Sequence, residues 1–327
     1  MLDELKTYFS AQHLTRSIAV LETVKTPILD TIFKQDTSNI LPTIAYEVYE
    51  QAPGVLPGVA PGAAAVNVRT GAKSMFYVKE GIDIRVQDSI TAHELNMYKL
   101  VGFRGLQEKI DRKLSILKDS IKRTREVLAA KALTGAISHA VVTEAGGVTS
   151  YEVSFGEPLE HTPRTPWGAE GASPYTDLRS MARMIEEETG YPDAFTVFIG
   201  YEAMDALLSY LFAQHGALIA SLVTVQNYGR ELTFGGFRFI EVMTKYVDVD
   251  GREAYAIPPD SVCLVAQNAP FIEYFSAIDD LEAGLQPVPI FAKSWEEKDP
   301  SRQVLLAHSK PLPVVHVPKA VCWAKVV

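Results

Sequence analysis

The sequence has only two cysteines in 327 residues, Cys263 and Cys322, and both lie in apolar stretches typical of strands. Two cysteines are too few for a disulfide framework or a cysteine-rich metal site. Isolated cysteines in apolar surroundings usually behave as small buried hydrophobic residues. We therefore expect two buried free thiols and no redox chemistry.

Long apolar runs are also missing. No stretch reaches the roughly 18 residues that a membrane-crossing helix needs. The first residues, Met1-Leu2-Asp3-Glu4-Leu5, lack the basic and then apolar pattern of a secretory signal. We therefore expect a protein that has no membrane partner and that folds in the cytoplasm.

An excess of positive charge is missing from the chain as a whole, because its formal net charge is −9. A protein that bound nucleic acid over its whole surface would need clustered lysine and arginine to neutralise phosphates. The charge is uneven, however, because residues 105–134 carry eight basic and four acidic side chains, a net charge of +4.

Two metal-site motifs are incomplete. The His-Glu pair at residues 93–94 lacks the second histidine of a zinc protease, because position 97 is methionine. The alternating aspartates at residues 248–250 are similar to the start of a calcium loop, but the twelfth position of that loop is Pro259 instead of glutamate. A hairpin turn explains these aspartates better.

Candidates for other chemistry are equally incomplete. His308 and His316 have no cysteine or carboxylate at ligand spacing, so we expect two ordinary histidines. The three glutamates at residues 186–188 fit a solvated helix face better than a catalytic pair. Residues 234–237, Phe-Gly-Gly-Phe, lack the third glycine and the following helix of a dinucleotide-binding loop. We predict no catalytic residues, no cofactor and no metal.

The first third of the chain predicts extended structure. Residues 7–33 have apolar positions without a sustained period, which predicts an extended arm with short helical turns. Residues 44–95 predict a long strand pair, and the proline- and glycine-rich residues 52–62 form its tip. An isolated hairpin is only marginally stable, so this one needs another surface to lie on.

The clearest helix spans residues 105–134. A rise of 1.5 Å per residue gives it a length of roughly 45 Å, longer than a typical globular helix. Its apolar positions recur every three, four or seven residues and form one stripe, made of Leu106, Ile110, Leu114, Leu117, Ile121 and Leu128.

A compact α+β lobe is predicted further along the chain. A strand pair over residues 136–156 precedes a helix over residues 173–190, with Ser173 as its N-cap. The following elements are a strand over 195–200, a helix over 203–211, and strands over 236–243 and 254–257 that are joined through an Asp250-Gly251 turn.

The last forty residues carry the most irregular pattern of the chain. Trp295 is followed by the charged turn Asp299-Pro300-Ser301-Arg302, and an apolar strand then leads to Ser309-Lys310-Pro311-Leu312-Pro313. This pattern resembles the C-terminal signature of the lambda-type phage major capsid protein E family. Residues 175–178 (Tyr-Thr-Asp-Leu) and 197–200 (Val-Phe-Ile-Gly) are similar to the same family. The signature residues are Trp295, Asp299, Pro300, Arg302 and Pro311.

The resemblance covers nearly the whole chain and implies a Hong Kong 97-type capsid fold of the α+β class. Its implied parts are an N-terminal arm (1–43), an extended E-loop β-hairpin (44–100), a peripheral domain (101–172) with the spine helix 105–134, an axial domain (173–284), and a C-terminal return to the peripheral domain (285–327).

The resemblance also implies a function without catalysis. Such a major capsid protein self-assembles into the pentamers and hexamers of an icosahedral tailed-phage or prophage head that encloses double-stranded DNA. Its implied partners are further copies of itself, a scaffolding protein, a portal, a decoration protein, and packaged DNA contacted without sequence specificity. The implied location is the virion, after assembly in the host bacterial cytoplasm.

Candidate contact residues follow from the same resemblance. Those of the E-loop are Lys73, Lys79, Glu80, Asp83 and Arg85. Those of the spine helix are the basic residues Lys109, Arg112, Lys113, Lys118, Lys122, Arg123 and Arg125, and we expect some of this positive charge to face the lumen or neighbouring acidic hairpins. Some relatives join a lysine to an asparagine of another subunit, but we expect no such cross-link between Lys73 or Lys79 and Asn268.

Two alternatives stay open at this point. An encapsulin-type shell has the same fold and encloses an enzyme cargo instead of DNA. An α+β hydrolase with aspartate and glutamate chemistry would be a monomer or small oligomer with a pocket. The long hairpin favours large assemblies over the hydrolase.

Overall fold

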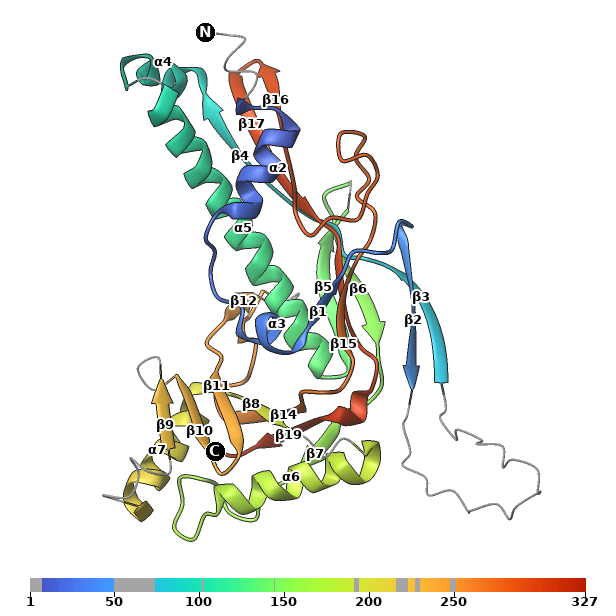
Figure 1. Cartoon of the computed structure of the whole chain (residues 1–327), viewed down its shortest axis with the longest axis vertical. Coiled ribbons are helices and arrows are strands. Elements are labelled where there is room, and N and C mark those ends of the chain that lie inside the picture. The colour runs from blue at the N-terminus through green and yellow to red at the C-terminus, as the bar shows by residue number, and fades with distance from the viewer. Residues whose placement is uncertain are drawn as a thin grey trace, which may run out of the picture. The chain divides into compact units, whose positions relative to one another are not determined.

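The computed structural model describes residues 8–49, 74–101, 103–143, 145–190, 194–215, 223–226, 230–247 and 251–327. Contacts divide the chain into two compact units, each made of three separate stretches (Figure 1). Unit 1 comprises Met1–Ala45, Val78–Leu128 and Ile272–Pro313, and unit 2 comprises Tyr46–Tyr77, Ala129–Phe271 and Val314–Val327.

Helix α5 (Phe103–Leu133) is the longest element, and its residues up to Leu128 belong to unit 1. All six residues of the apolar stripe predicted from the sequence are buried on it. The preceding helix α4 (Ala92–Val101) begins with a capping box. The Thr91 backbone N–H donates to the Glu94 carboxylate at 2.9 Å, and the Glu94 N–H donates to the Thr91 hydroxyl at 3.2 Å.

Two three-stranded sheets complete unit 1, and each recruits strands from distant parts of the chain. The antiparallel sheet has the order β16 (Phe291–Lys298), β17 (Ser301–Ser309) and β4 (Ile84–Thr91). Helix α2 (Ala11–Val20) packs against β16 through the buried Leu14 and Ile18. The other sheet has the order β1 (Lys34–Asp36), β15 (Phe271–Phe275) and β18 (Pro311–Val315), and helix α3 (Pro27–Ile32) leads directly into β1.

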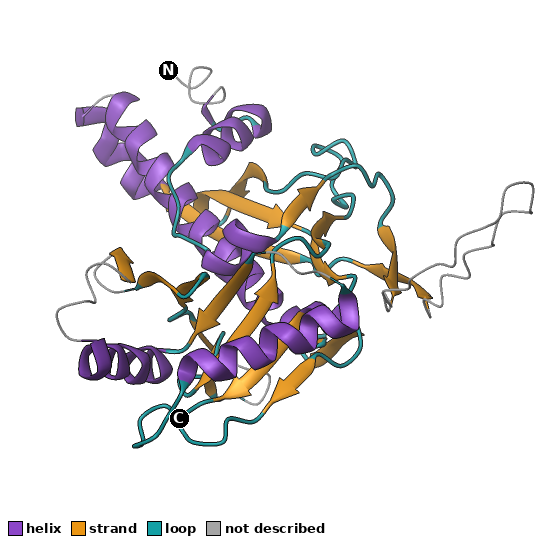
Figure 2. Ribbon diagram, turned by 60° about the horizontal axis from the view of Figure 1, so that its bottom comes forward, coloured by secondary structure: helices purple, strands orange, loops and turns teal. Residues whose placement is uncertain are grey.

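Unit 2 is organised around a seven-stranded sheet. Its central strands β8 and β14 are buried along their whole length. Helix α6 (Pro174–Thr189) contacts β7, β14 and β19, and helix α7 (Tyr201–His215) contacts β14 (Figure 2). The strand order is β7 (Leu159–His161), β19 (Val321–Lys325), β14 (Ser261–Ala266), β8 (Phe195–Ile199), β11 (Phe237–Glu241), β10 (Glu231–Phe234) and β9 (Val223–Gln226).

The two cysteines lie on adjacent strands of this sheet, Cys263 on β14 and Cys322 on β19. Both are buried free thiols, as the sequence predicted. Burial raises the pKa of the Cys322 thiol to about 12, and the nearby Glu160 adds to the effect. Burial also raises the pKa of Cys263 well above its ordinary value. Both sulfurs are therefore inert packing groups.

Three further sheets of the described chain contain two strands each. They are β2 (Thr43–Tyr49) with β3 (Ser74–Glu80), β5 (Ala136–Val142) with β6 (Val148–Ser154), and β12 (Lys245–Val247) with β13 (Glu253–Tyr255). The predicted strand pair over residues 136–156 is confirmed by β5 and β6. Asp248 and Asp250, the predicted turn between β12 and β13, lie outside the described residues.

The predicted helices are present. Residues 105–134 correspond to α5, and residues 173–190 to α6, which ends at the left-handed Gly190 with φ of 69°. Ser173 is the N-cap of α6 but makes no side-chain bond to the helix backbone. Its hydroxyl pairs instead with the Thr176 hydroxyl at 2.7 Å, and the predicted N-cap position is confirmed.

Strand partners differ more from the sequence prediction. Residues 44–95 do not form one strand pair, because β3 pairs with β2 while β4 pairs with β17. The predicted β11–β13 pair is likewise replaced by β12–β13. The predicted arm over residues 7–33 contains the helices α2 and α3. Residues 285–327 contribute to both units, because β16 and β17 lie in unit 1 whereas β19 pairs with β14 and β7 in unit 2. Alternation identifies a half-buried strand but not its neighbour.

Candidate assembly surfaces

The β2–β3 hairpin has one attached strand and one exposed strand. On β2, Ile44, Tyr46 and Val48 are buried. The Tyr46 ring stacks on Tyr77 with centroids 5.6 Å apart. On β3, Met75, Phe76 and Val78 are 59%, 71% and 56% exposed. An exposed apolar strand of this kind is an expected protein contact, because leaving such side chains in water is unfavourable.

A buried lysine fixes the base of the hairpin within unit 1. Lys310 is only 2% exposed, and its ammonium lies 2.5 Å from Glu80 and 2.7 Å from Asp279. Burial opposes the charged ammonium, but the hydrogen bonds to the two carboxylates outweigh it and raise the pKa of Lys310. A Cβ at Gly81 would lie 2.7 Å from the Lys310 carbonyl oxygen, so a side chain at position 81 would disrupt this contact.

The E-loop candidates predicted from the sequence divide into three groups. Lys73 lies outside the described residues. Lys79 is exposed on β3. The other three have partners within the chain, and Glu80 binds Lys310. Asp83 binds His308 and also pairs with Arg85 at 2.9 Å. Burial would raise the pKa of Asp83, but the hydrogen bond from His308 and the nearby cations lower it overall. Glu80, Asp83 and Arg85 thus serve contacts within their own subunit.

Several basic residues of α5 have partners inside unit 1. Lys109 pairs with Glu94 at 2.9 Å, and Lys113 pairs with Asp88 at 2.7 Å. The buried Lys118 ammonium donates to the Ala19 and Leu21 carbonyls at 3.1 and 2.7 Å. Within the described ranges, the basic residues of this set without an ion pair are Arg112, Lys118, Lys122 and Arg123, and of these four Lys118 is buried and bound to backbone carbonyls.

Arg125 is the most deeply buried of these cations. Its guanidinium donates two hydrogen bonds, of 2.7 and 2.6 Å, to the carboxylate of Glu273 on β15. The two side chains are 2% and 1% exposed. The guanidinium also lies 5.0 Å from the Phe275 ring centroid, at cation–π distance. This bidentate pair joins α5 to the β1–β15–β18 sheet inside unit 1.

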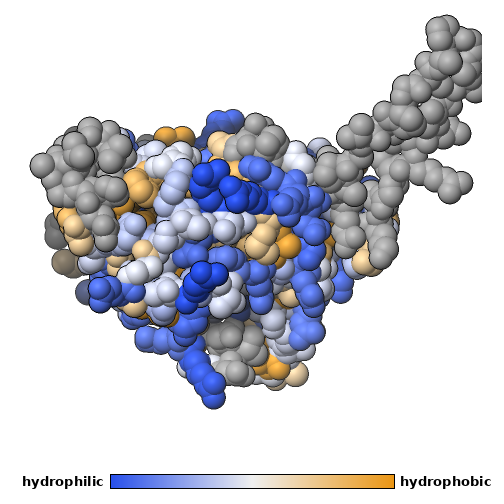
Figure 3. Space-filling model, turned by 90° about the horizontal axis from the view of Figure 1, so that it is seen from below, coloured by the Kyte–Doolittle hydropathy of each residue, from blue (hydrophilic) through white to orange (hydrophobic). Residues whose placement is uncertain are grey.

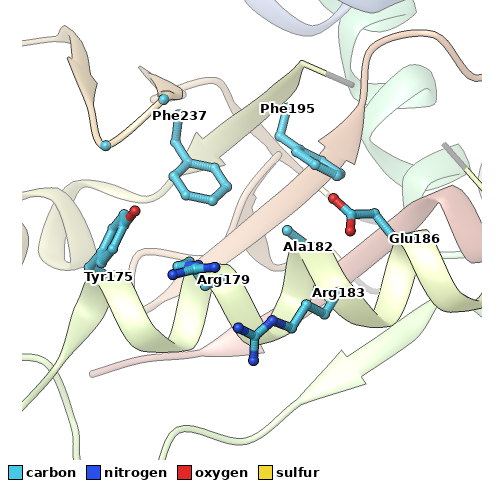
Figure 4. Close-up of a pocket in the computed structure, with 9 residues that line it drawn as sticks. Tyr175, Arg179, Ala182, Arg183, Glu186, Phe195 and Phe237 are labelled. Carbon is cyan, nitrogen blue, oxygen red and sulfur yellow. The ribbon is translucent and has the colours of Figure 1, made fainter. Parts of the chain in front are cut away.

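A shallow groove lies on unit 2 between α6 and the β10–β11 turn. Figure 4 shows Tyr175, Arg179 and Glu186 along one face of α6, opposite Phe237 and Phe195. The floor is apolar and buried, whereas the rim carries the exposed Arg179 and Arg183. Neither arginine has an ion pair among the residues that the structure describes. The groove lining thus combines an apolar floor with Arg179, Arg183 and the carboxylate of Glu186.

The Gly-Gly sequence beside this groove is a turn rather than a cofactor loop. Phe234 and Phe237 are cross-strand partners, and Gly235 and Gly236 between them have φ of 60° and 89°. A two-residue hairpin turn with two positive φ angles favours glycine at both positions. A Cβ at Gly235 would also lie 2.5 Å from the Tyr175 ring. Both glycines are thus explained by backbone geometry and packing.

The signature residues gather on the β16–β17 hairpin and on β18. Asp299 and Pro300, joined by a cis peptide bond, form the turn of the hairpin. Arg302 pairs with Glu297 across the two strands. Trp295 is 37% exposed, with the Lys293 ammonium 6.0 Å from its ring. Pro311 opens β18, and its carbonyl accepts the Ile82 N–H at 3.0 Å. These residues shape a hairpin and do not form a chemical site.

Both histidines singled out in the sequence contact groups within the described chain. His308 binds Asp83, and His316 Nδ1 lies 2.6 Å from the Glu47 carbonyl, so both histidines have ordinary structural partners. The described part of the chain contains no cluster of three metal-ligating side chains. It also contains no helix long and apolar enough to cross a bilayer. Figure 3 shows polar side chains over most of the face seen from below, with apolar ones in small patches.

Several solved structures share this fold. A prophage capsid protein from E. coli CFT073 matches with a TM-score of 0.64 at 18% identity, over 97% of this chain and 99% of that one. A phage-related protein from Bordetella bronchiseptica RB50 matches with 0.58 at 8% identity, over 95% of each chain. The mature capsid of bacteriophage PhiM1 matches with 0.55 at 9% identity, over 93% of this chain and 87% of that one.

Likeness at these identities establishes the fold, which is the Hong Kong 97-type capsid fold that the sequence predicted. No curated protein sequence matches the chain. The sequence pattern of the family described as "Phage major capsid protein E" matches residues 10–326, nearly the full length. The chain therefore belongs to the phage major capsid protein E family, and its role is structural rather than catalytic.

Proposed function

We propose that this protein is the repeating subunit of an icosahedral tailed-phage or prophage head, arranged in pentamers and hexamers around double-stranded DNA. The observation that carries the proposal is the exposed apolar strand β3. A subunit with Met75, Phe76 and Val78 more than half exposed on one short strand gains stability when another copy covers them. Rings of subunits with heterologous contacts can close into a shell.

We propose the domain roles by analogy with the capsid fold. We assign residues 1–43 to an N-terminal arm, residues 44–100 to the E-loop, residues 101–172 to the peripheral domain and residues 173–284 to the axial domain. The groove with Arg179 and Arg183 on unit 2 supports this last assignment, because unpaired guanidinium groups beside an apolar floor suit an acidic edge of a neighbouring subunit. Residues 285–327 are assigned to the C-terminal return to the peripheral domain.

The remaining partners are assigned by charge and by family. Arg112, Lys122 and Arg123 are free to contact DNA phosphates without reading sequence. Scaffolding protein, portal and decoration protein are the further partners, and assembly takes place in the host bacterial cytoplasm before the protein enters the virion. The family match disfavours the encapsulin alternative, in which the shell would hold an enzyme.

The first test is assembly of the purified full-length protein, followed by electron microscopy and light scattering. The wild type should form closed shells or rings, whereas Met75→Ser/Phe76→Ser should remain folded but assemble poorly. Phe212→Ser is the matched control, because Phe212 is an equally exposed aromatic residue, at 63%, on α7. Equal assembly of the β3 variant and the control would contradict the proposed role of β3.

A second test addresses DNA contact. Lys122→Glu/Arg123→Glu should assemble normally but package less DNA, because two phosphate-binding charges are reversed. Normal DNA content in shells of this variant would refute the assignment of these residues. Shells that contain a host enzyme instead of DNA would favour the encapsulin alternative.

A further inference from the structure

A buried carboxylate without a cationic partner lies where α5 meets α3. Glu126 of α5 is 1% exposed, and both of its carboxylate oxygens accept backbone hydrogen bonds. Oε1 accepts the Ile28 N–H at 2.8 Å, and Oε2 accepts the Leu29 N–H at 3.0 Å. Figure 1 shows α3 beside α5, and all of these residues belong to unit 1. Glu126 thus ties the N-terminal segment to the long helix.

Helix α3 depends on this carboxylate because its own cap is incomplete. Its first residue is Pro27, which has no N–H, and the N-cap Thr26 makes no side-chain bond to the helix. The Thr26 hydroxyl is itself buried and has no hydrogen-bond partner among the described residues. The first free N–H groups of α3 are those of Ile28 and Leu29, and a helix start normally needs acceptors for them. Glu126 supplies both acceptors from another element.

The surroundings of Glu126 disfavour its charge. The adjacent Arg125 is already bound by both oxygens of Glu273. The ionisable groups that act on Glu126 are Asp30 on α3 and Glu273 on β15, and both are acidic. Burial, followed by these two repulsions, outweighs the two backbone hydrogen bonds and raises the pKa of Glu126 to about 7. The carboxylate is therefore poised to change its charge near neutral pH.

We propose that Glu126 is a pH-sensitive latch that holds residues 26–33 against α5 more tightly when its carboxyl group is protonated. Undocking of the segment returns Glu126 to water, where the charged form costs little. A carboxyl group whose pKa is higher in the docked state binds its proton more strongly there, so docking strengthens as pH falls. The neutral group still offers its carbonyl oxygen to one of the two N–H donors. The inference concerns the subunit itself and does not depend on the proposed function.

Hydrogen exchange of the purified full-length subunit tests the latch. Protection of residues 26–33, corrected for intrinsic exchange, should rise roughly thirtyfold between pH 8 and pH 5.5, given a pKa that moves from 4.5 undocked to about 7 docked. Glu126→Gln cannot titrate, so its protection should be flat over the same range. The α6 peptide, residues 174–189, reports any general change in stability.

Asp119→Asn is the matched control on the same helix. Asp119 also holds the N-terminal segment, accepting the Val24 N–H at 3.1 Å and the Thr23 hydroxyl at 2.9 Å, but it is only partly buried. This variant should loosen residues 23–24 and keep the pH dependence of residues 26–33. Wild-type protection that is flat or falls toward pH 5.5 overturns the proposal. A pH dependence that survives in Glu126→Gln, or disappears in Asp119→Asn, overturns it as well.

Discussion

Replacing Glu273 by glutamine should severely destabilise unit 1, although only a charge is removed. Arg125 would keep its buried guanidinium, now without the bidentate carboxylate at 2.6 and 2.7 Å. At 2% exposure the guanidinium cannot recover water without opening the surrounding structure. The expected cost comes from this stranded charge and not from the loss of a favourable contact as such.

The size of the expected loss of stability follows from the burial of both Arg125 and Glu273. Breaking a fully buried pair by removing one member costs about 3–5 kcal/mol. Arg125→Met should fall at the upper end of that range, because it leaves the carboxylates of Glu273 and Glu126 buried near each other without a cation. The double variant Arg125→Met/Glu273→Leu removes both charges and should lie within about 1–2 kcal/mol of the wild type.

Urea unfolding of the unassembled subunit measures these differences. Exchange protection of α5 residues 114–121 reports unit 1 and keeps the result separate from unit 2, since the two units need not unfold together. A loss of about 4 kcal/mol corresponds to roughly a thousandfold increase in the unfolding constant. If Glu273→Gln costs less than about 1 kcal/mol, or if the double variant is as unstable as the single ones, the reasoning from stranded charge is wrong.

Three further predictions use the same kind of argument. Lys310→Met should lower the free energy of unfolding in urea by only about 1–2 kcal/mol, because its partners Glu80 and Asp279 are 54% and 56% exposed and regain water. A loss as large as that of Glu273→Gln would show that the exposure of the partners does not reduce the cost. Gly235→Ala should lower the free energy of unfolding by about 3 kcal/mol, since alanine there has a positive φ and clashes with the Tyr175 ring. Gly236→Ala also has a positive φ but lies in open space, so it should cost about 1 kcal/mol. Equal melting temperatures of the two variants would contradict the clash. Glu94→Gln should weaken the start of α4 by about 1 kcal/mol. Hydrogen bonds from Thr91 and Lys109 lower the pKa of Glu94 to about 2, so its stabilising contribution is present above pH 4.5 and is lost as pH falls toward 2. Circular dichroism should therefore show less helix in the variant than in the wild type at pH 7, and nearly equal helix content at pH 2.5.

The long helix and its buried stripe could be predicted from the sequence because they depend on local periodicity. The burial of Lys118 and Arg125 was missed, although a signal was present. Counted in steps of three and four from Leu114 and Ile121, both residues fall on the apolar stripe. A cation on the buried face of a helix implies a buried partner, but the spacing alone does not name Glu273 or the Leu21 carbonyl.

The pairing of strands could not be predicted, because it depends on contacts between distant parts of the chain. The alternation over Ile84–Thr91 correctly indicates a half-buried strand, yet its partner β17 lies more than two hundred residues away. The exposed strand β3 has no matching sequence signal, since Met75, Phe76 and Val78 on their own resemble core residues. The fold was predicted from the family resemblance instead. The residues that carry this resemblance lie on hairpins, where the periodicity of apolar residues gives no information.

The division of the chain into units has a practical consequence for experiments on this protein. The chain passes between the units inside β2, β3, α5, β15 and β18, and never at an independent linker. A truncation at any of these points would cut a helix or strand and leave at least one unit without one of its three stretches. Assembly contacts should therefore be mapped with point substitutions in the intact chain, because deletion fragments would report the failure of folding instead of the loss of a contact.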